Sequence, residues 1–119
     1  MAGSIVHYEV PAADVDRAAG FWGTLFGLNI GESMMPDFQY RMFQTGEGEG
    51  GAIMQSESPG SGLVVYLNTD EIDATVAKVR ELGGTADDKK PVPGYGWFAA
   101  CKDTEGNSFS LWQSDENAA

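Results

Sequence analysis

The 119-residue chain is long enough for one domain with a modest hydrophobic core. Hydrophobic residues make up 42% of it, which is typical of a globular rather than a disordered protein. It carries 18 acidic and 7 basic side chains, a formal net charge of −11, and the acidic excess is present in both halves of the sequence. A surface of that sign repels phosphate backbones and anionic lipids and attracts cations, so the composition argues against a nucleic-acid-binding or membrane-binding protein.

The cysteine content and the first residues indicate the compartment. Cys101 is the only cysteine, so no internal disulfide can form, and a reducing, cytoplasmic location is expected. Because Cys101 falls within a predicted strand and lacks a clearly basic neighbourhood, it is interpreted as structural rather than catalytic. The first residues show no basic region followed by an apolar run, which predicts no signal peptide, and no apolar run is long enough for a membrane span.

The first half of the sequence begins with a strand and a helix. Residues 4–10 have the pattern of a strand, which Pro11 is expected to end. Residues 14–26 predict a helix with one apolar stripe, acidic residues in its first turn, and Gly27 just beyond its end. Three shorter strand candidates follow, over residues 28–34, 38–45 and 51–55.

The second half repeats this order. Residues 56–62 have the composition of a linker. Residues 63–67 then predict a strand, and a helix begins near Asp70 and ends at Gly83. Three strand candidates complete the half, over residues 86–91, 95–102 and 107–113.

The two halves align with a constant shift of 57 positions. This shift places Asp16 on Asp73 and Gly27 on Gly84. We interpret the pattern as one domain built from a duplicated βαβββ module. Module one covers about residues 4–55, the linker 56–62, and module two about 63–113.

Three local strings carry a resemblance to a known family. His7 lies in the first strand, seven residues before Asp14; residues 79–84 read Val-Arg-Glu-Leu-Gly-Gly; and residues 94–98 read Gly-Tyr-Gly-Trp-Phe and lead to the closing segment 103–113. The chain resembles the vicinal oxygen chelate superfamily, which includes glyoxalases, bleomycin-resistance proteins and extradiol dioxygenases. The resemblance implies an α+β fold in which the two tandem βαβββ modules form a curved mixed sheet with a concave cleft.

The resemblance also allows the metal-binding positions to be checked. In metal-dependent members, the first and last strands of each module supply four ligands. His7 matches the first position, and the shift of 57 makes Val64 its counterpart. Ser110 stands where the family pattern places a carboxylate, and its counterpart is Ile53. Because Val and Ile offer no ligand atom, no metal cofactor is expected; the alternative is a divalent metal (Zn, Ni, Mn or Fe) with His7 as one ligand.

Strand alternation predicts a mixed polar and apolar face in each module. Neighbouring residues of a strand point to opposite sides, so His7 and Glu9 share one side of the first strand. The same reasoning assigns Ile53 and Gln55 to this mixed face and places Met54 beneath the helix. The candidate ligand-binding residues are His7, Glu9, Tyr40, Gln55, Tyr66, Ser110 and Trp112.

We therefore expect a small-molecule-binding protein of the glyoxalase and bleomycin-resistance type that works without a metal. No catalytic residue is assigned, and whether the protein is an enzyme stays open. One alternative is a metal-dependent lyase, isomerase or dioxygenase with His7 as a ligand; another is a non-catalytic interaction module. The acidic charge favours a cationic ligand, and the exposed edges of a curved sheet favour a homodimer.

Overall fold

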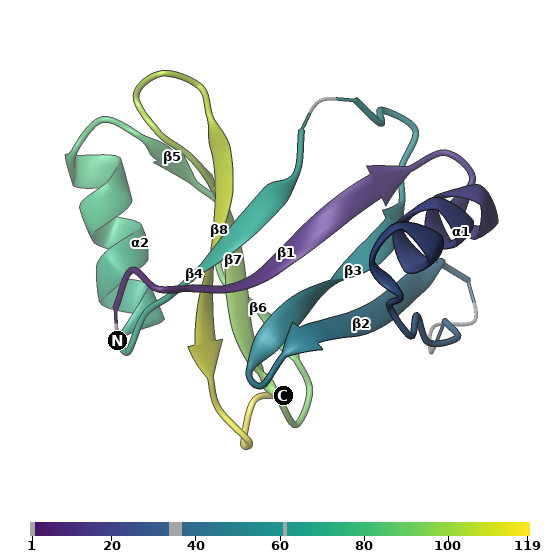
Figure 1. The fold of residues 1–119 in the computed structure, drawn as a ribbon. Coiled ribbons are helices and arrows are strands. Elements are labelled where there is room, and N and C mark those ends of the chain that lie inside the picture. The colour runs from purple at the N-terminus through teal and green to yellow at the C-terminus, as the bar shows by residue number, and fades with distance from the viewer. Residues whose placement is uncertain (1, 34–36, 61) are drawn as a thin grey trace. The chain divides into compact units, whose positions relative to one another are not determined.

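The computed structural model describes residues 2–33, 37–60 and 62–119 (Figure 1). The chain forms two compact units, one containing His7–Val64 and the other Met1–Val6 with Val65–Ala119. Each unit combines a helix with a sheet that holds both parallel and antiparallel strand pairs. The predicted α+β class is confirmed. Within the part of the chain that the structure describes, neither helix is long and apolar enough to cross a membrane.

The unit of His7–Val64 is built around three strands and one helix. Its elements are β1 (Ile5–Ala12), α1 (Val15–Phe26), β2 (Tyr40–Gly46) and β3 (Glu49–Gln55). The strand order is β2-β3-β1, with β1 parallel to β3 and β2 antiparallel to β3. The helix-covered side forms a hydrophobic core of Val10, Ala12, Val15, Ala19, Phe43 and Ile53.

Local sequence signals set both ends of α1. The carboxylate of Asp14 accepts a hydrogen bond from the backbone N–H of Arg17 at 3.0 Å, which satisfies one of the free donors of the first turn. Gly27 ends the helix in the left-handed region, at φ +67°, where a side chain would be strained. The helix therefore begins and ends where the sequence predicts.

Two predictions for the first half are wrong in detail. Pro11 does not end β1, which continues to Ala12, because the fixed φ of proline suits an extended strand. Residues 28–33 form no strand, and residue 34, the last of that candidate, lies outside the described residues. Leu28 and Ile30 pack against the core beneath α1 although the backbone there is irregular. The hydrogen bond from Gly31 N to the carbonyl of Met42, at 2.9 Å, does not extend into a ladder.

The second unit repeats the plan with more strands. Its elements are β4 (Val64–Asn68), α2 (Ile72–Glu81), β5 (Thr85–Ala86), β6 (Lys90–Val92), β7 (Gly96–Lys102) and β8 (Ser108–Ser114). The strand order is β4-β8-β7-β5, and β6 also pairs with β7. The single strand predicted near 86–91 is two short strands, β5 and β6, which pair with different parts of β7.

The core under α2 contains the single cysteine. Ile72, Val76, Ala99, Cys101 and Leu111 form a buried cluster between the helix and the sheet. Burial, with the nearby carboxylate of Asp87, raises the pKa of the Cys101 thiol, and the guanidinium of Arg80 offsets this in part. The thiol is neutral at pH 7, which supports the structural interpretation of this residue.

The strand register shows that the shift of 57 does not hold to the end of the modules. Val10 pairs with Ile53 in the first unit, and Leu67 pairs with Leu111 in the second. Val10 and Leu67 differ by 57 positions, whereas Ile53 and Leu111 differ by 58. The second module therefore carries one extra residue between its helix and its last strand. The constant shift gave Ile53 as the counterpart of Ser110 in the first module, and this was wrong. The strand register shows that the counterpart is Ala52.

Candidate functional site

A chain of three polar side chains lies on the face of the first unit opposite α1. The hydroxyl of Tyr40, from β2, donates a hydrogen bond to Oε2 of Glu9 at 2.8 Å. The same hydroxyl lies 2.8 Å from Nε2 of His7, and both His7 and Glu9 come from β1. The His7 and Tyr40 rings lie nearly parallel, with 6.3 Å between their centroids. The structure therefore brings together three of the seven predicted site residues.

Burial determines the charge of the His7 and Glu9 side chains in this hydrogen-bonded network. Glu9 is only 7% exposed, so its carboxylate needs donors such as the Tyr40 hydroxyl. Burial also lowers the pKa of His7 below its ordinary value of 6.5, so the imidazole is neutral at pH 7. Because the Tyr40 hydroxyl gives its proton to Glu9, the same oxygen accepts from Nε2–H of His7, and the network selects this tautomer.

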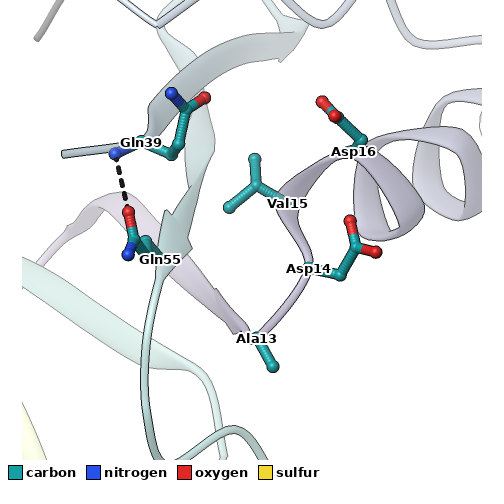
Figure 2. A pocket seen from close by; sticks show the side chains of 6 residues that line it. All are labelled: Ala13, Asp14, Val15, Asp16, Gln39 and Gln55. Atoms are coloured by element: carbon teal, nitrogen blue, oxygen red, sulfur yellow. Dashed lines mark hydrogen bonds between the residues drawn. The ribbon is translucent and has the colours of Figure 1, made fainter. Parts of the chain in front are cut away.

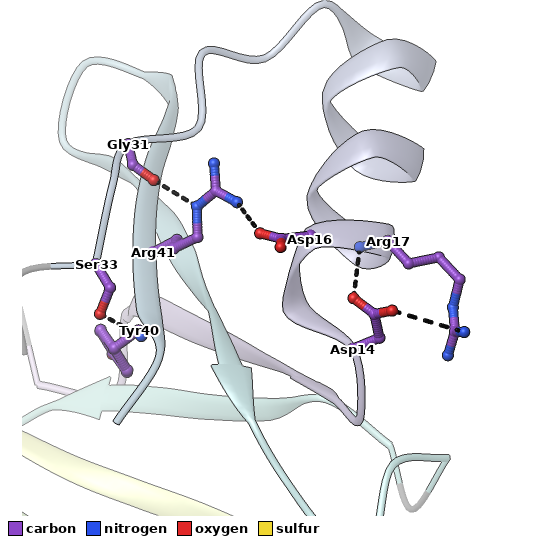
Figure 3. A network of polar contacts seen from close by, with 7 residues as sticks. All are labelled: Asp14, Asp16, Arg17, Gly31, Ser33, Tyr40 and Arg41. Atoms are coloured by element: carbon purple, nitrogen blue, oxygen red, sulfur yellow. Dashed lines mark hydrogen bonds and ion pairs between the residues drawn. The ribbon is translucent and has the colours of Figure 1, made fainter. Parts of the chain in front are cut away.

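Tyr40 is held in place from its backbone. Its N–H donates to Oγ of Ser33 at 3.1 Å (Figure 3). Ser33 in turn donates to the carbonyl of Phe38 at 3.0 Å. The neighbouring Arg41 donates to the carbonyl of Gly31 at 2.7 Å and to Oδ1 of Asp16 at 3.1 Å. These bonds fix the start of β2 against the loop after α1 and against the first turn of α1.

Methionine side chains flank the polar chain. In the strand register Met42 pairs with Ala52, Glu9 pairs with Ala52, and Tyr40 pairs with Met54. Paired residues share a face, so both methionines lie on the side of Glu9. Met54 is a site residue that the sequence analysis missed, because alternation in β3 was expected to place Ile53 and Gln55 on this face.

Gln55 lies on the side of the sheet that α1 covers. The sequence predicted it on the other side, with His7 and Glu9, and that prediction is wrong. Gln55 pairs with Ala12, beside the core under α1, and its Oε1 accepts from the backbone N–H of Gln39 at 3.2 Å. Ile53 also faces this core and is fully buried. Gln55 instead lines a shallow depression of about 350 Å³ near the start of α1 (Figure 2). The depression is lined by Ala13, Asp14, Val15, Asp16, Gln39 and Gln55.

The remaining candidates lie in the second unit, on the side of its sheet opposite α2. Tyr66 of β4 pairs with Ser110 of β8, and Ser110 is 3% exposed. Trp112 pairs with Phe98 of β7, and its indole N–H donates to Oγ of Ser114 at 3.2 Å. Tyr66, Ser110 and Trp112 thus share one face of their own unit, as strand alternation predicts.

The residues present do not fit a divalent metal of the kind that the superfamily pattern implies. Among the described residues, no group of three or more His, Cys, Asp or Glu side chains could hold an ion. Nε2 of His7 is engaged by the Tyr40 hydroxyl, and the position equivalent to Ser110 is Ala52, which has no ligand atom.

Sequence comparisons identify the family. Residues 6–112 match the model of the glyoxalase-like domain. A glyoxylase-like domain-containing protein of Didymella fabae is 33% identical over 119 residues, with 92% of each chain covered. A putative glyoxylase of Mycobacterium bovis is 30% identical over 113 residues, which are 92% of this chain but 43% of that relative. The chain thus spans less than half the length of the mycobacterial relative.

Solved structures share the fold at low sequence identity. Methylmalonyl-CoA epimerase from Mycobacterium tuberculosis superposes with a TM-score of 0.72 at 15% identity, covering 95% of this chain and 88% of that one. A hypothetical protein from Bacillus halodurans gives a TM-score of 0.73 at 16% identity, covering 100% and 99%. With the family model matching nearly its whole length, the chain belongs to the glyoxalase-like domain family of the vicinal oxygen chelate superfamily.

Proposed function

We propose that the protein binds a small organic molecule on the face formed by His7, Glu9 and Tyr40, without a resident metal ion. The hydrogen-bonded chain from the imidazole through the Tyr40 hydroxyl to the buried Glu9 carboxylate carries this proposal. Such a chain offers both donor and acceptor atoms, and the adjacent Met42 and Met54 offer adaptable apolar contacts. Apolar side chains around a few placed polar groups are typical of small-molecule sites.

The state of His7 supports the metal-independent form of the proposal. A metal ligand must present a lone pair, whereas Nε2 of His7 carries its proton toward the Tyr40 hydroxyl. Coordination through Nε2 would require this bond to break and the Glu9–Tyr40 pair to rearrange. The face is therefore better suited to hydrogen bonding with an organic ligand than to holding an ion.

Charge suggests the class of ligand. The chain has a net charge of −11, and Glu9 places a carboxylate within the proposed face. An amine or other organic cation would be attracted to this surface and would gain from proximity to Glu9. We propose a cationic ligand of the kind that drug-sequestering, bleomycin-resistance-like proteins bind. We also propose a homodimeric assembly and a reducing cytoplasmic location, which suits the single buried Cys101.

Calorimetric titration tests the proposal. The panel contains basic glycopeptides, other organic amines, neutral and anionic metabolites, and methylmalonyl-CoA, which one epimerase of the same fold holds in its solved structure. We expect an amine to bind wild type and to bind Tyr40→Phe roughly five- to thirtyfold more weakly, since one polar contact contributes about 1–2 kcal/mol. Gln55→Ala, on the opposite face, is the matched control and should bind as wild type does. Absence of binding across the panel would refute the ligand proposal and favour an interaction module.

Metal analysis of protein purified without chelator tests the second part of the proposal. We expect less than stoichiometric Zn, Ni, Mn or Fe, and no change in ligand affinity when chelator is added. Stoichiometric metal that is lost in His7→Ala would overturn metal independence and support a metal-dependent lyase, isomerase or dioxygenase.

A further inference from the structure

Hydrogen bonds tie the loop after α1 to the start of β2. The Tyr40 N–H donates to Oγ of Ser33 at 3.1 Å. Gly31 is bound on both sides: its N–H donates to the carbonyl of Met42 at 2.9 Å, and its carbonyl accepts from Nε of Arg41 at 2.7 Å. The bond from Arg41 is the shortest of these, and it is the one with a charged donor, which makes it the strongest tie between loop and strand.

Arg41 reaches the loop from the face opposite the proposed ligand site. It pairs with Ile53, which is buried in the core under α1. Its neighbour Tyr40 instead pairs with Met54, on the side of the sheet that carries Glu9. Because successive side chains of a strand point to opposite faces, the guanidinium influences the ligand face only through the backbone that Arg41 shares with Tyr40.

The guanidinium of Arg41 makes bonds in two directions. Nε reaches the Gly31 carbonyl, and Nη1 donates to Oδ1 of Asp16 at 3.1 Å (Figure 3). The Asp16 side chain is 93% exposed, so solvent weakens the ion pair, whereas the Arg41 side chain is only 15% exposed and its bond to the carbonyl is better protected. A lysine ammonium is a single point charge and cannot reproduce this fork of donors. Loss of the guanidinium should therefore release Gly31.

Tyr40 needs this support because it is the first residue of β2. The end of a strand opens more readily than its middle. The Tyr40 hydroxyl must also stay 2.8 Å from both Oε2 of Glu9 and Nε2 of His7, and hydrogen bonds weaken steeply when their angles change. A small movement of the backbone at Tyr40 would therefore break the polar chain.

We propose that Arg41 is a positioning residue for the polar chain. Through Gly31 and the backbone of Tyr40, it keeps the Tyr40 hydroxyl between His7 and Glu9, and it thereby raises the affinity for a ligand that it does not touch. The effect on affinity rests on the function proposed above, whereas the effect on the position of the Tyr40 ring does not.

The second unit supplies a matched control. Arg80 donates to the carbonyl of Ala86 at 2.7 Å and to Oδ1 of Asp88 at 3.2 Å, so it makes the same two kinds of bond as Arg41. Arg41→Lys and Arg80→Lys each keep the positive charge and lose the fork of donors. A difference between the two variants therefore reports on the place of the arginine and not on the general loss of an arginine contact.

NMR contacts between the His7 and Tyr40 rings test the positioning role without a ligand. His7 is the only histidine in the chain, so its ring signals are unambiguous. Nuclear Overhauser effects between the two rings should be present in wild type and in Arg80→Lys and be lost or weakened in Arg41→Lys. Unchanged effects in Arg41→Lys would overturn the proposal. Should Arg41→Lys not fold, Arg41→Met, which keeps the apolar stem, decides the matter by the same measurement.

Calorimetry with benzylamine tests the effect on affinity, because this probe joins an ammonium for Glu9 to an apolar ring for the methionines. Arg41→Lys should bind roughly three- to tenfold more weakly than wild type, as for the loss of about one hydrogen bond, and Arg80→Lys should bind as wild type does. In a Tyr40→Phe background, Arg41→Lys should weaken binding by less than about twofold, since the hydroxyl that it positions is gone.

Two calorimetric results would contradict the proposal. Fully additive losses from Arg41→Lys and Tyr40→Phe would show that Arg41 does not act through the Tyr40 hydroxyl. Absence of benzylamine binding by wild type would overturn the claim about affinity together with the proposed ligand class, and the ring contacts alone would then decide whether Arg41 positions Tyr40.

Discussion

Oε1 of Gln113 accepts a hydrogen bond from the backbone N–H of Ile72 at 2.8 Å, so the last strand of the second unit caps the start of its helix. The residue at the N-cap position, Glu71, makes no side-chain hydrogen bond to the first turn. In α1 the local Asp14 makes the equivalent bond. The two helices thus satisfy a first-turn donor by different means, one local and one through the sheet.

Replacement of Gln113 should therefore destabilise the protein although it lies in a strand. Gln113→Ala leaves the Ile72 N–H without this acceptor, and we expect a loss of about 1 kcal/mol in the free energy of unfolding, similar to the loss of a local cap. Gln113→Glu keeps an acceptor and adds a favourable charge at the helix start, so it should retain most of the stability. Urea denaturation of both variants measures the difference; equal losses would show that the bond contributes nothing.

These two caps illustrate how much of the fold is predictable from sequence. Asp14 and Gly27 lie beside the ends of α1, so local chemistry is enough to place that helix. The partner of Ile72 lies 41 residues away in the sequence, and no local pattern identifies it. Residues 28–33 fail as a strand for a related reason: a strand needs a ladder of bonds to a partner, and the bond from Gly31 N to the carbonyl of Met42 does not extend into one.

The face assignment in β3 is the second testable result. Ile53 is fully buried beneath α1, and its neighbour Met54 is partly exposed on the other side. Ile53→Ala should lower the free energy of unfolding by about 2–5 kcal/mol, the range for emptying a packed site. Met54→Ala should cost clearly less in the same urea experiment. The reverse order would restore the face assignment predicted from the sequence.

The strand register explains why the site is only partly predictable from the sequence. His7 and Glu9 share one side because β1 alternates simply from its first residue onward, and Tyr40 joins them from β2. The second module carries one inserted residue, between α2 and β8. The pairing of strands reveals this insertion, whereas the alternation of side chains within one strand does not. Alternation separates Ala52 and Met54 from Ile53 and Gln55 but does not say which pair faces the helix, so the sequence predicts the wrong face for Gln55.

The titration of His7 is the third prediction. It is the only histidine in the chain, so proton NMR of an untagged protein shows one imidazole to follow against pH. Burial lowers its pKa, and the midpoint should fall below 6.5. In the unfolded chain the imidazole takes up its proton first, so the free energy of unfolding should decrease as pH falls from about 6.5 toward the folded pKa. His7→Gln should lose this part of the pH dependence; a midpoint at or above 6.5 would contradict the burial argument.

Removal of the Tyr40 hydroxyl is the fourth prediction. Tyr40→Phe takes one donor from the buried Glu9 carboxylate and the acceptor from Nε2 of His7. We expect a loss of about 1–3 kcal/mol, the usual cost of depriving a buried polar group of a partner. Tyr8→Phe is the matched control, since that ring packs on Phe43 and the structure records no hydrogen bond from its hydroxyl to a described residue. Similar unfolding midpoints for the two variants would show that the polar chain does not stabilise the fold.

The reactivity of the single thiol is the last prediction. Cys101 is 4% exposed and burial raises its pKa, so both access and thiolate formation are limited in the folded protein. Iodoacetamide should therefore modify native protein slowly and urea-unfolded protein rapidly, as mass spectrometry can follow. The double variant Cys101→Ala/Ala100→Cys moves the thiol by one residue to the exposed side of β7 and should react rapidly while folded. Rapid labelling of native wild type, at a rate close to that of the double variant, would mean that β7 opens often enough to expose its buried face.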